Sequence, residues 1–336
     1  MRLGVLDVGS NTVHLLVVDA VRGGHPTPTS STKTGLRLAE HLRDGYLDRV
    51  GADALVAAVA EARAEAASLG CQDLLAFATS AVRDAANSGE VLALVRDRTG
   101  VDLQVLSGPD EAALTFLAVR RWFGWSAGQL LVLDIGGGSL EMAVGRDERP
   151  AVALSLPLGA ARLTRTWFAA DPPDRREIRA LAEHVHDVLA PAAARLLDEG
   201  PPDRCVVTSK TFRSLARLTG AAPRSAGARV PRRLSSAGLR QVVAFISRMS
   251  STDLAELEGV SSSRAHQLVA GALVARGAMD ALGLDEVEVC PWALREGIIL
   301  GRLDHVPADG ALVAAERTRG TDRPAAPGRS TSQKAR

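Results

Sequence analysis

Two turns in the sequence combine an acidic side chain with glycine and hydroxyl-bearing residues. The first runs from Asp7 to Thr12 (DVGSNT), and the second runs from Asp134 to Ser139 (DIGGGS). Glycines and small side chains let backbone N–H groups turn toward an anion and approach it closely. The acid itself would repel a phosphate, but it can hold a Mg²⁺ ion that neutralises the phosphate. Two such turns, if they face each other, could bind a chain of phosphates from both sides of a cleft.

The two turns belong to a longer internal repeat. Without gaps, Leu6–Gly9 aligns with Leu133–Gly136, Thr12 with Ser139, and His14 with Glu141. A repeat of this length predicts two domains that begin with the same strand–turn–strand unit. A single turn of this kind is also ordinary hairpin chemistry, but the matched copies favour a shared anion-binding role.

Two further segments carry acids suited to phosphate chemistry. Glu141 follows Asp134 on the return strand, where the two acids could share a cation, although a strand acid can also simply face solvent. Glu111 lies in SGPDEAA, at the start of a helix that follows a strand. Acids there also favour the helix dipole, but a carboxylate over a phosphate cleft can activate water, which is worth about 10²–10⁴ in rate.

Arg83 and Lys210 each follow a strand and open a helix, in TSAVRD (79–84) and TSKT (208–211). Hydroxyls and helix N–H groups at such a position can bind an anion, and an arginine can clamp one with two hydrogen bonds. The alternative for Arg83 is a helix cap with a surface arginine beside it.

The elements that must position these groups can be read from the apolar patterns. We expect strands at 3–8, 13–19, 74–78, 101–106, 130–145 (as a hairpin), 151–156, 204–208 and 286–290, with helices at 51–69, 87–99, 109–121, 175–199, 210–218, 236–249, 261–282 and 292–303. We expect domains at 1–126 and 127–305. The stretch 306–336 is polar and aperiodic, which predicts a disordered tail.

Composition restricts the class of protein. The chain has 336 residues, of which 46% are hydrophobic and only 3% aromatic, so Ala, Val and Leu must fill two cores. The sequence has no apolar run of about 18 residues and no signal peptide, which predicts a cytoplasmic protein that does not bind membranes. A net charge of +1 argues against a nucleic-acid partner, and three widely spaced cysteines predict neither a zinc site nor disulfides.

Five motifs together resemble the exopolyphosphatase / guanosine pentaphosphate phosphohydrolase family: DVGSNTVH, TSAVRDA, SGPDEA, DIGGGSLE and LREG. They occur in the order and spacing of that family over residues 3 to about 303. The resemblance implies an α/β fold with two ribonuclease-H-like lobes of the actin-like ATPase superfamily. It also implies Mg²⁺ (with Mn²⁺ as a substitute), release of orthophosphate from polyphosphate, and a homodimer.

The resemblance also assigns roles to residues. Glu111 matches the catalytic acid, and Asp134 and Glu141 match the metal-linked acids. The residues that we expect to contact substrate are Asp7, Gly9, Ser10, Asn11, Thr12, Arg83, Gly136, Gly137, Gly138, Ser139, Ser209, Lys210 and Thr211. The sequence departs from the family pattern at Asp110, which replaces a Glu, and at Lys210, which replaces a Gly. It also lacks the extra C-terminal helical domains of longer members.

Four functions remain open from the sequence. Polyphosphate hydrolysis leads, and hydrolysis of guanosine pentaphosphate uses the same chemistry. A non-catalytic sensor of polyphosphate or of the stringent-response alarmone (p)ppGpp is opposed by the retained acids. A kinase or chaperone ATPase would need an adenosine pocket, which the Lys210 loop does not resemble. With only two domains, short polyphosphate chains are the expected substrate, and a basic loop (Arg213, Arg217, Arg224, Arg229, Arg232 and Arg233) could either guide the chain or be solvated.

Overall fold

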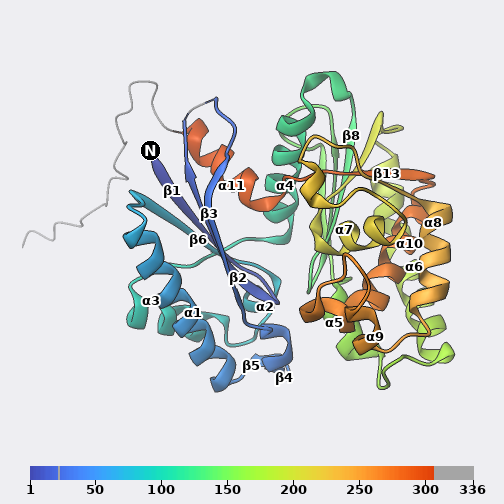
Figure 1. The fold of residues 1–336 in the computed structure, drawn as a ribbon, viewed down its shortest axis with the longest axis horizontal. Coiled ribbons are helices and arrows are strands. Elements are labelled where there is room, and N and C mark those ends of the chain that lie inside the picture. The colour runs from blue at the N-terminus through green and yellow to red at the C-terminus, as the bar shows by residue number, and fades with distance from the viewer. Residues whose placement is uncertain (22, 306–336) are drawn as a thin grey trace, which may run out of the picture.

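The computed structural model describes residues 1–21 and 23–305, which form two lobes, each built on its own mixed sheet (Figure 1). The expected tail, 306–336, lies outside the described residues. Within the described part of the chain, no helix has both the length and the apolar character needed to cross a membrane.

The first sheet has the strand order β3-β2-β1-β6-β7. Strand β1 pairs antiparallel with β2 and parallel with β6, so the chain forms a three-strand meander and then crosses over to the other side of β1. The elements of this part are β1 (Arg2–Val8), β2 (Thr12–Asp19), β3 (Pro28–Gly35), β4 (Leu42–Arg43), β5 (Tyr46–Leu47), α1 (Arg49–Ser68), β6 (Asp73–Ala78), α2 (Ser80–Arg83), α3 (Ser88–Thr99) and β7 (Gln104–Val105).

The second sheet repeats this plan in the order β10-β9-β8-β11-β13-β12. Its meander of three antiparallel strands is again followed by a parallel strand next to the first one. The elements are β8 (Leu130–Ile135), β9 (Leu140–Gly145), β10 (Val152–Leu156), α5 (Ala160–Trp167), α6 (Arg175–Leu197), β11 (Arg204–Val207), α7 (Ser209–Leu218), β12 (Arg233–Ser235), α8 (Ser236–Ile246), α9 (Ser251–Ala255), α10 (Leu268–Ala281) and β13 (Glu286–Val289).

The internal repeat is visible in the geometry of the turns. Gly9 N donates to Thr12 O at 3.0 Å, and Gly136 N donates to Ser139 O at 2.9 Å. The gapless alignment made His14 equivalent to Glu141. In the structure these two residues also occupy equivalent places, since Asp7 pairs across its hairpin with His14 and Asp134 pairs with Glu141. The two copies therefore present equivalent positions at the ends of β1 and β8.

Two helices lie between the two sheets, α4 (Gly108–Phe123) and α11 (Leu294–Asp304) (Figure 1). Phe116 and Val119 of α4 pack on the second sheet, whereas Ile298 and Ile299 of α11 pack on the first. The helices touch closely at Gly297, where an added Cβ would lie only 1.9 Å from Leu114 O. This contact fixes the start of α4 over the space between the lobes. We propose that the chain divides near residue 126, as expected, into lobes of 1–126 and 127–305, and that the two exchange helices, since α4 packs on the second sheet and α11 on the first.

The remaining helices cover the outer faces of the sheets. Apolar side chains of α1 and α3, such as Leu55 and Val95, pack on the first sheet. A larger core forms where α5, α6, α7, α8 and α10 cover the second sheet, and it includes Leu181, Phe212 and Leu273. Leu, Val and Ala make up most of both cores, as the low aromatic content predicted.

Candidate active site between the two lobes

A cleft of about 430 Å³ lies between the lobes, where both repeated turns meet the start of α4. It is open to substrate from solvent and is lined almost entirely by polar side chains and glycine. The sequence-predicted residues that line it are Asp7, Gly9, Ser10, Asn11, Thr12, Glu111, Asp134, Gly136, Gly137, Ser139, Glu141, Ser209 and Lys210.

The two glycine-containing turns approach each other directly. An added Cβ at Gly137 would lie 2.8 Å from the Cβ of Ser10 and from Nδ2 of Asn11, and one at Gly138 would lie 2.4 Å from Ser80 Oγ. Glycine is therefore required at these positions for the lobes to close. Ser10 Oγ and Ser80 Oγ share a hydrogen bond of 3.0 Å beside the turns.

Four acids face this cleft: Asp7, Glu111, Asp134 and Glu141. Burial raises the pKa of Glu141 to about 7, and the neighbouring Asp134 charge adds to this rise, although Ser155 Oγ donates to the Glu141 carboxylate at 2.9 Å. Burial also raises the pKa of Asp134, which accepts a hydrogen bond from the Thr208 hydroxyl. Acids with raised pKa values at one place indicate a site that favours a bound cation.

Glu111 lies in the first turn of α4. Ser107 caps this helix, since its Oγ accepts from Asp110 N at 3.2 Å. Arg83 Nη1 donates to Glu111 Oε2 at 3.1 Å and to Leu106 O at 3.2 Å. Burial raises the pKa of Glu111 well above its usual range, the Glu141 charge adds to that rise, and Arg83 opposes it. A carboxyl group with such a raised pKa is suited to accepting a proton near neutral pH.

The same cleft also carries positive charge, from Lys33, Lys210, Arg213, Arg264 and Arg295. Burial, together with the neighbouring cations, lowers the pKa of Lys210 to about 8 and that of Arg213 to about 10. Cations crowded together without enough acids to pair them indicate a site for a polyanion.

His14 occupies the position in the first lobe that Glu141 occupies in the second. Burial lowers the pKa of His14 to about 3, helped by Arg295 and Lys33, so its imidazole is neutral at physiological pH. Its Nε2 shares a 2.8 Å hydrogen bond with Ser31 Oγ. The duplicated turns therefore differ in charge, and only the second carries a pair of acids.

Asp134 and Glu141 fit a Mg²⁺ ion whose other ligands are substrate and water better than a metal that is held by protein ligands alone. Within residues 1–21 and 23–305, no group of three or more His, Cys, Asp or Glu side chains is arranged to hold a metal. Mg²⁺ is commonly bound by one or two carboxylates while substrate phosphates and water complete its shell. Two buried acids with raised pKa values next to a polyanion site match that requirement.

Three of the predicted residues lie behind the lining of the cleft. Arg83 reaches it only through Glu111. Gly138 lines a small adjacent cavity with Ser80 and Arg162, and Thr211 donates to Ile135 O at 3.3 Å. At the Lys210 loop, the left-handed backbone conformation falls on Ser209 (φ 69°).

Sequence reasoning missed Lys33, Arg264 and Arg295 as residues of the cleft. Arg295 belongs to the LREG motif, which was a usable signal, whereas Lys33 and Arg264 lie in polar segments without any pattern. The basic loop contributes less than a guide for substrate would require. Arg213 lines the cleft, and the charge of Arg224 acts on Arg213 and Lys33 there. The other four pair elsewhere: Arg217 with Glu258, Arg233 with Glu286, Arg229 over Trp122, and Arg232 with loop carbonyls.

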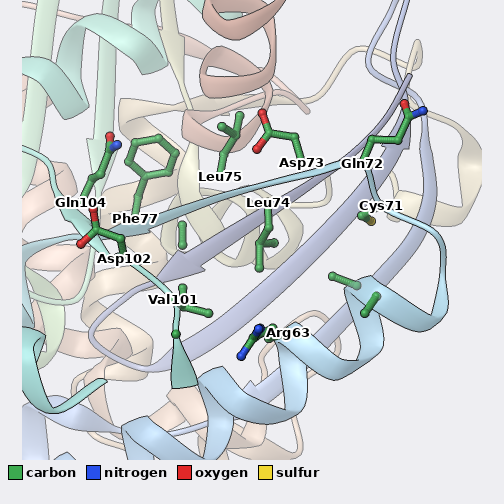
Figure 2. A pocket seen from close by; sticks show the side chains of 14 residues that line it. Arg63, Cys71, Gln72, Asp73, Leu74, Leu75, Phe77, Val101, Asp102 and Gln104 are labelled. Atoms are coloured by element: carbon green, nitrogen blue, oxygen red, sulfur yellow. The ribbon is translucent and has the colours of Figure 1, made fainter. Parts of the chain in front are cut away.

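A second cavity of about 480 Å³ lies away from the cleft, along the part of β6 that β7 does not cover (Figure 2). Figure 2 shows Leu74 pointing toward α1 while Asp73 and Leu75 point to the opposite side of the strand. Arg63, the nearest cation, donates to Thr99 O. This cavity contains none of the predicted site residues, so its volume alone does not identify a site.

Comparison with known proteins places the chain among phosphatases of one family. The sequence model of the Ppx/GppA phosphatase family matches residues 17–306. Exopolyphosphatase 1 of Mycobacterium tuberculosis is 62% identical over 314 residues, which cover 93% of this chain and 91% of that protein. Exopolyphosphatase 1 of Mycobacterium leprae is 60% identical over 322 residues, covering 96% and 95%.

Solved structures agree with the fold. An exopolyphosphatase from Cytophaga hutchinsonii superposes with a TM-score of 0.82 at 22% identity, covering 91% of this chain and 99% of that one. The Aquifex aeolicus member of the Ppx/GppA family gives a TM-score of 0.74 at 23% identity, covering 90% and 97%. These likenesses confirm the expected α/β fold with two lobes.

Proposed function

The chain belongs to the Ppx/GppA phosphatase family, and on that premise we propose that it is an exopolyphosphatase that releases terminal orthophosphate from short inorganic polyphosphate, with Glu111 as the general base. The close mycobacterial relatives named exopolyphosphatase support the reaction. One observation carries the mechanism: four acids and five cations line one cleft between two matched turns.

The five lining cations would account for binding of a polyanion. Lys33, Lys210, Arg213, Arg264 and Arg295 would contact the phosphate chain, while backbone N–H groups of the two turns approach its end. No Phe, Tyr or Trp is among the described residues that line the cleft, and the one imidazole there, that of His14, shares a hydrogen bond with Ser31 Oγ. This lining favours inorganic polyphosphate over guanosine pentaphosphate.

In this proposal, Glu111 acts on water at the end of that chain. Its carboxylate accepts a proton from water as the water oxygen attacks the terminal phosphorus, and the bond to the bridging oxygen breaks. Orthophosphate and a chain shorter by one phosphate are the products. The raised pKa of Glu111 brings this base toward the operating pH, where a general base is most effective.

Asp134 and Glu141 would hold Mg²⁺, or Mn²⁺ in its place. The bound ion would supply charge neutralisation for the phosphate oxygens and for the acids around them. The protein's own contribution is the placement of two carboxylates on neighbouring strands, with Thr208 and Ser155 donating hydrogen bonds that fix their orientation.

Parallel assays of phosphate release from polyphosphate, guanosine pentaphosphate and ATP, each with Mg²⁺, test the proposal. We expect turnover of short polyphosphate at a kcat/KM above that of both nucleotides. Faster turnover of guanosine pentaphosphate would assign the substrate to the alternative. Binding of polyphosphate without release of phosphate would instead indicate a sensor.

A further inference from the structure

A single arginine of α5 connects the second glycine turn to the first lobe. The backbone N of Arg162 donates to Gly137 O at 2.9 Å, and its Nε donates to Gly138 O at 2.8 Å. Its Nη2 reaches across to the other lobe and pairs with the Asp84 carboxylate. Arg162 therefore contacts the turn that must approach Ser10 and, at the same time, an acid of the opposite lobe.

Asp84 passes this contact inward. Its Oδ1 accepts from Arg83 Nε at 3.2 Å, while its Oδ2 faces Arg162. Arg83 in turn donates from Nη1 to Glu111 Oε2 at 3.1 Å and to Leu106 O at 3.2 Å. Three consecutive ion pairs thus run from the second glycine turn to the carboxylate of Glu111.

The burial of these side chains increases along the chain of contacts. Arg162 and Asp84 are 32% and 34% exposed, whereas Arg83 and Glu111 are 19% and 14% exposed. Exposed ion pairs contribute little to folding, so the outer pair is poorly explained as a device for stability. At the inner end, burial works to lower the pKa of Arg83, but the carboxylates of Glu111 and Asp84 raise it overall. Arg83 is therefore held charged between two acids.

We propose that Arg162 is a positioning residue, which orients Glu111 through Asp84 and Arg83 only when the glycine turn of the second lobe is closed against the first. When the lobes part, Arg162 withdraws from Asp84. Asp84 then competes freely for the guanidinium of Arg83, and the Glu111 carboxylate loses its fixed orientation. The base would thus be oriented only when substrate is enclosed. This inference rests on the proposed role of Glu111 as the base.

Arg165 provides a matched comparison one turn further along α5. It also crosses between the lobes, where its Nη1 donates to Ala39 O. Ala39 N donates to Ser10 O at 3.2 Å, so Arg165 contacts a segment next to the first turn and makes no ion pair in the series that ends at Glu111. A residue that merely holds the lobes together would behave like Arg165, whereas a positioning residue would affect the turnover step.

The test compares Arg162→Ala, Arg162→Lys, Arg165→Ala, Asp84→Asn and Glu111→Gln with the parent on short polyphosphate. We expect Arg162→Ala to lower kcat by about 10- to 100-fold, with a change in KM and in Tm no larger than that of Arg165→Ala. Arg162→Lys should recover part of kcat, since it retains a charge for Asp84. Equal kcat values for Arg162→Ala and Arg165→Ala would overturn the inference.

A double-mutant cycle provides a second, independent measurement. Arg162→Ala and Asp84→Asn break the same connection, so the double variant should be no slower than the slower single variant. Arg165→Ala combined with Asp84→Asn should show multiplied effects. Multiplied effects for the first pair would also contradict the inference. If Arg162→Ala fails to fold, Arg162→Gln removes the charge while keeping a long side chain, and with Asp84→Asn it gives the same cycle.

Glu111→Gln separates failure of this inference from failure of the proposed function. If Glu111→Gln retains normal kcat, the assignment of the base is wrong and the inference fails with it. If Glu111→Gln loses activity while Arg162→Ala matches Arg165→Ala, the base stands and only the positioning role of Arg162 is excluded.

Discussion

Arg295 Nη1 donates to Asp7 Oδ2 at 3.0 Å, so the last helix of the described chain holds the acid that ends its first strand. The Nε of Arg295 is buried and has no hydrogen-bond partner among the described residues. An unpaired buried N–H is costly, and a phosphate oxygen in the cleft would satisfy it. The pair thus keeps a guanidinium beside the first turn with one donor available for substrate.

Substitution of Arg295 should therefore weaken substrate binding. Arg295→Ala leaves Asp7 without its partner in a cleft that binds an anion, and we expect KM for polyphosphate to rise by about tenfold or more. Arg295→Lys keeps a charge for Asp7 but lacks the planar guanidinium, so its KM should be intermediate. Steady-state kinetics at constant Mg²⁺ measure both, and a KM for Arg295→Ala equal to that of the parent would contradict this role.

Glu111→Gln should lower kcat by about 10²–10⁴ and leave KM nearly unchanged, because a general base acts mainly in the transition state. Asp110→Asn is the matched control. Asp110 is adjacent in sequence but exposed, and its carboxylate accepts from Ser107 Oγ rather than facing the cleft. We expect near-normal kcat from that variant. Comparable losses in both variants would point to the start of α4 rather than to the base.

Glu141 should make the stability of the metal-free protein depend on pH. Its pKa is about 7 in the folded protein against 4.5 as an ordinary value, so between these values the folded state binds more protons than the unfolded state. Stability should therefore fall as pH rises from about 4.5 to 7. Glu141→Gln should make this fall shallower, and Mg²⁺ should offset it in the parent at pH 7 and above.

Thermal unfolding in EDTA from pH 5 to 8, repeated with Mg²⁺, measures that dependence. Identical slopes for Glu141→Gln and the parent would exclude Glu141 as the titrating group.

In activity assays, Glu141→Gln and Asp134→Asn should need more Mg²⁺ for half-maximal turnover. Full turnover of the parent in excess EDTA would remove the metal from the proposal.

Lys210 should contribute to binding only while it is charged. Its pKa of about 8 means that the charge is present below pH 8 and is lost above it. The KM of the parent should rise as pH increases through 8, and Lys210→Ala should have a higher KM that lacks this step. Its effect should shrink as salt rises. Arg233→Ala, which removes a cation paired with Glu286 outside the cleft, serves as the control.

Much of this architecture was predictable because local patterns and global fold agree. The expected ranges are close to the structure for the repeated turns and for the helices at 108–123 and 175–197. Apolar periodicity identifies the helices, and glycine marks the turns. The strand β3 (PTSSTKTG) could not be found this way. It is an edge strand of alternating exposure without large apolar residues, and it forms because β2 offers it a partner.

Two other expected elements also differ from the structure. The expected strand at 101–106 shortens to Gln104–Val105, and the expected helix at 261–282 divides into a 3₁₀ segment, Ser262–Gln267, and α10. That segment brings Arg264 into the cleft and sets the amide of Gln267 against Asn11 at 3.4–3.5 Å. Residues brought together from positions so far apart carry no spacing signal. Lys33 and Arg264 could therefore not be predicted as cleft residues from the sequence.

The positions of the cations also bear on the length of the preferred substrate. Processive cleavage requires contacts to many phosphates at once, so that the chain slides after each cut rather than leaving. The five lining cations all lie within a cleft of about 430 Å³. Outside it, Arg217, Arg229, Arg232 and Arg233 of the basic loop already have partners within the described chain. Arg224 of the same loop remains, and its charge acts on Lys33 and Arg213 at the cleft. Few contacts therefore remain for phosphates beyond the cleft.

We expect the enzyme to act distributively and to have a higher kcat/KM on short oligomers than on long chains. A time course on a chain of several hundred phosphates, resolved on a gel, should show the whole population shifting gradually to shorter lengths. Arg217→Ala and Arg233→Ala should leave this pattern unchanged, because those cations are engaged in ion pairs. Long chains that instead disappear one at a time, without intermediates, would mean that a continuous binding surface exists beyond the cleft. If such processive cleavage were lost in Arg217→Ala or Arg233→Ala, that surface would lie on the basic loop.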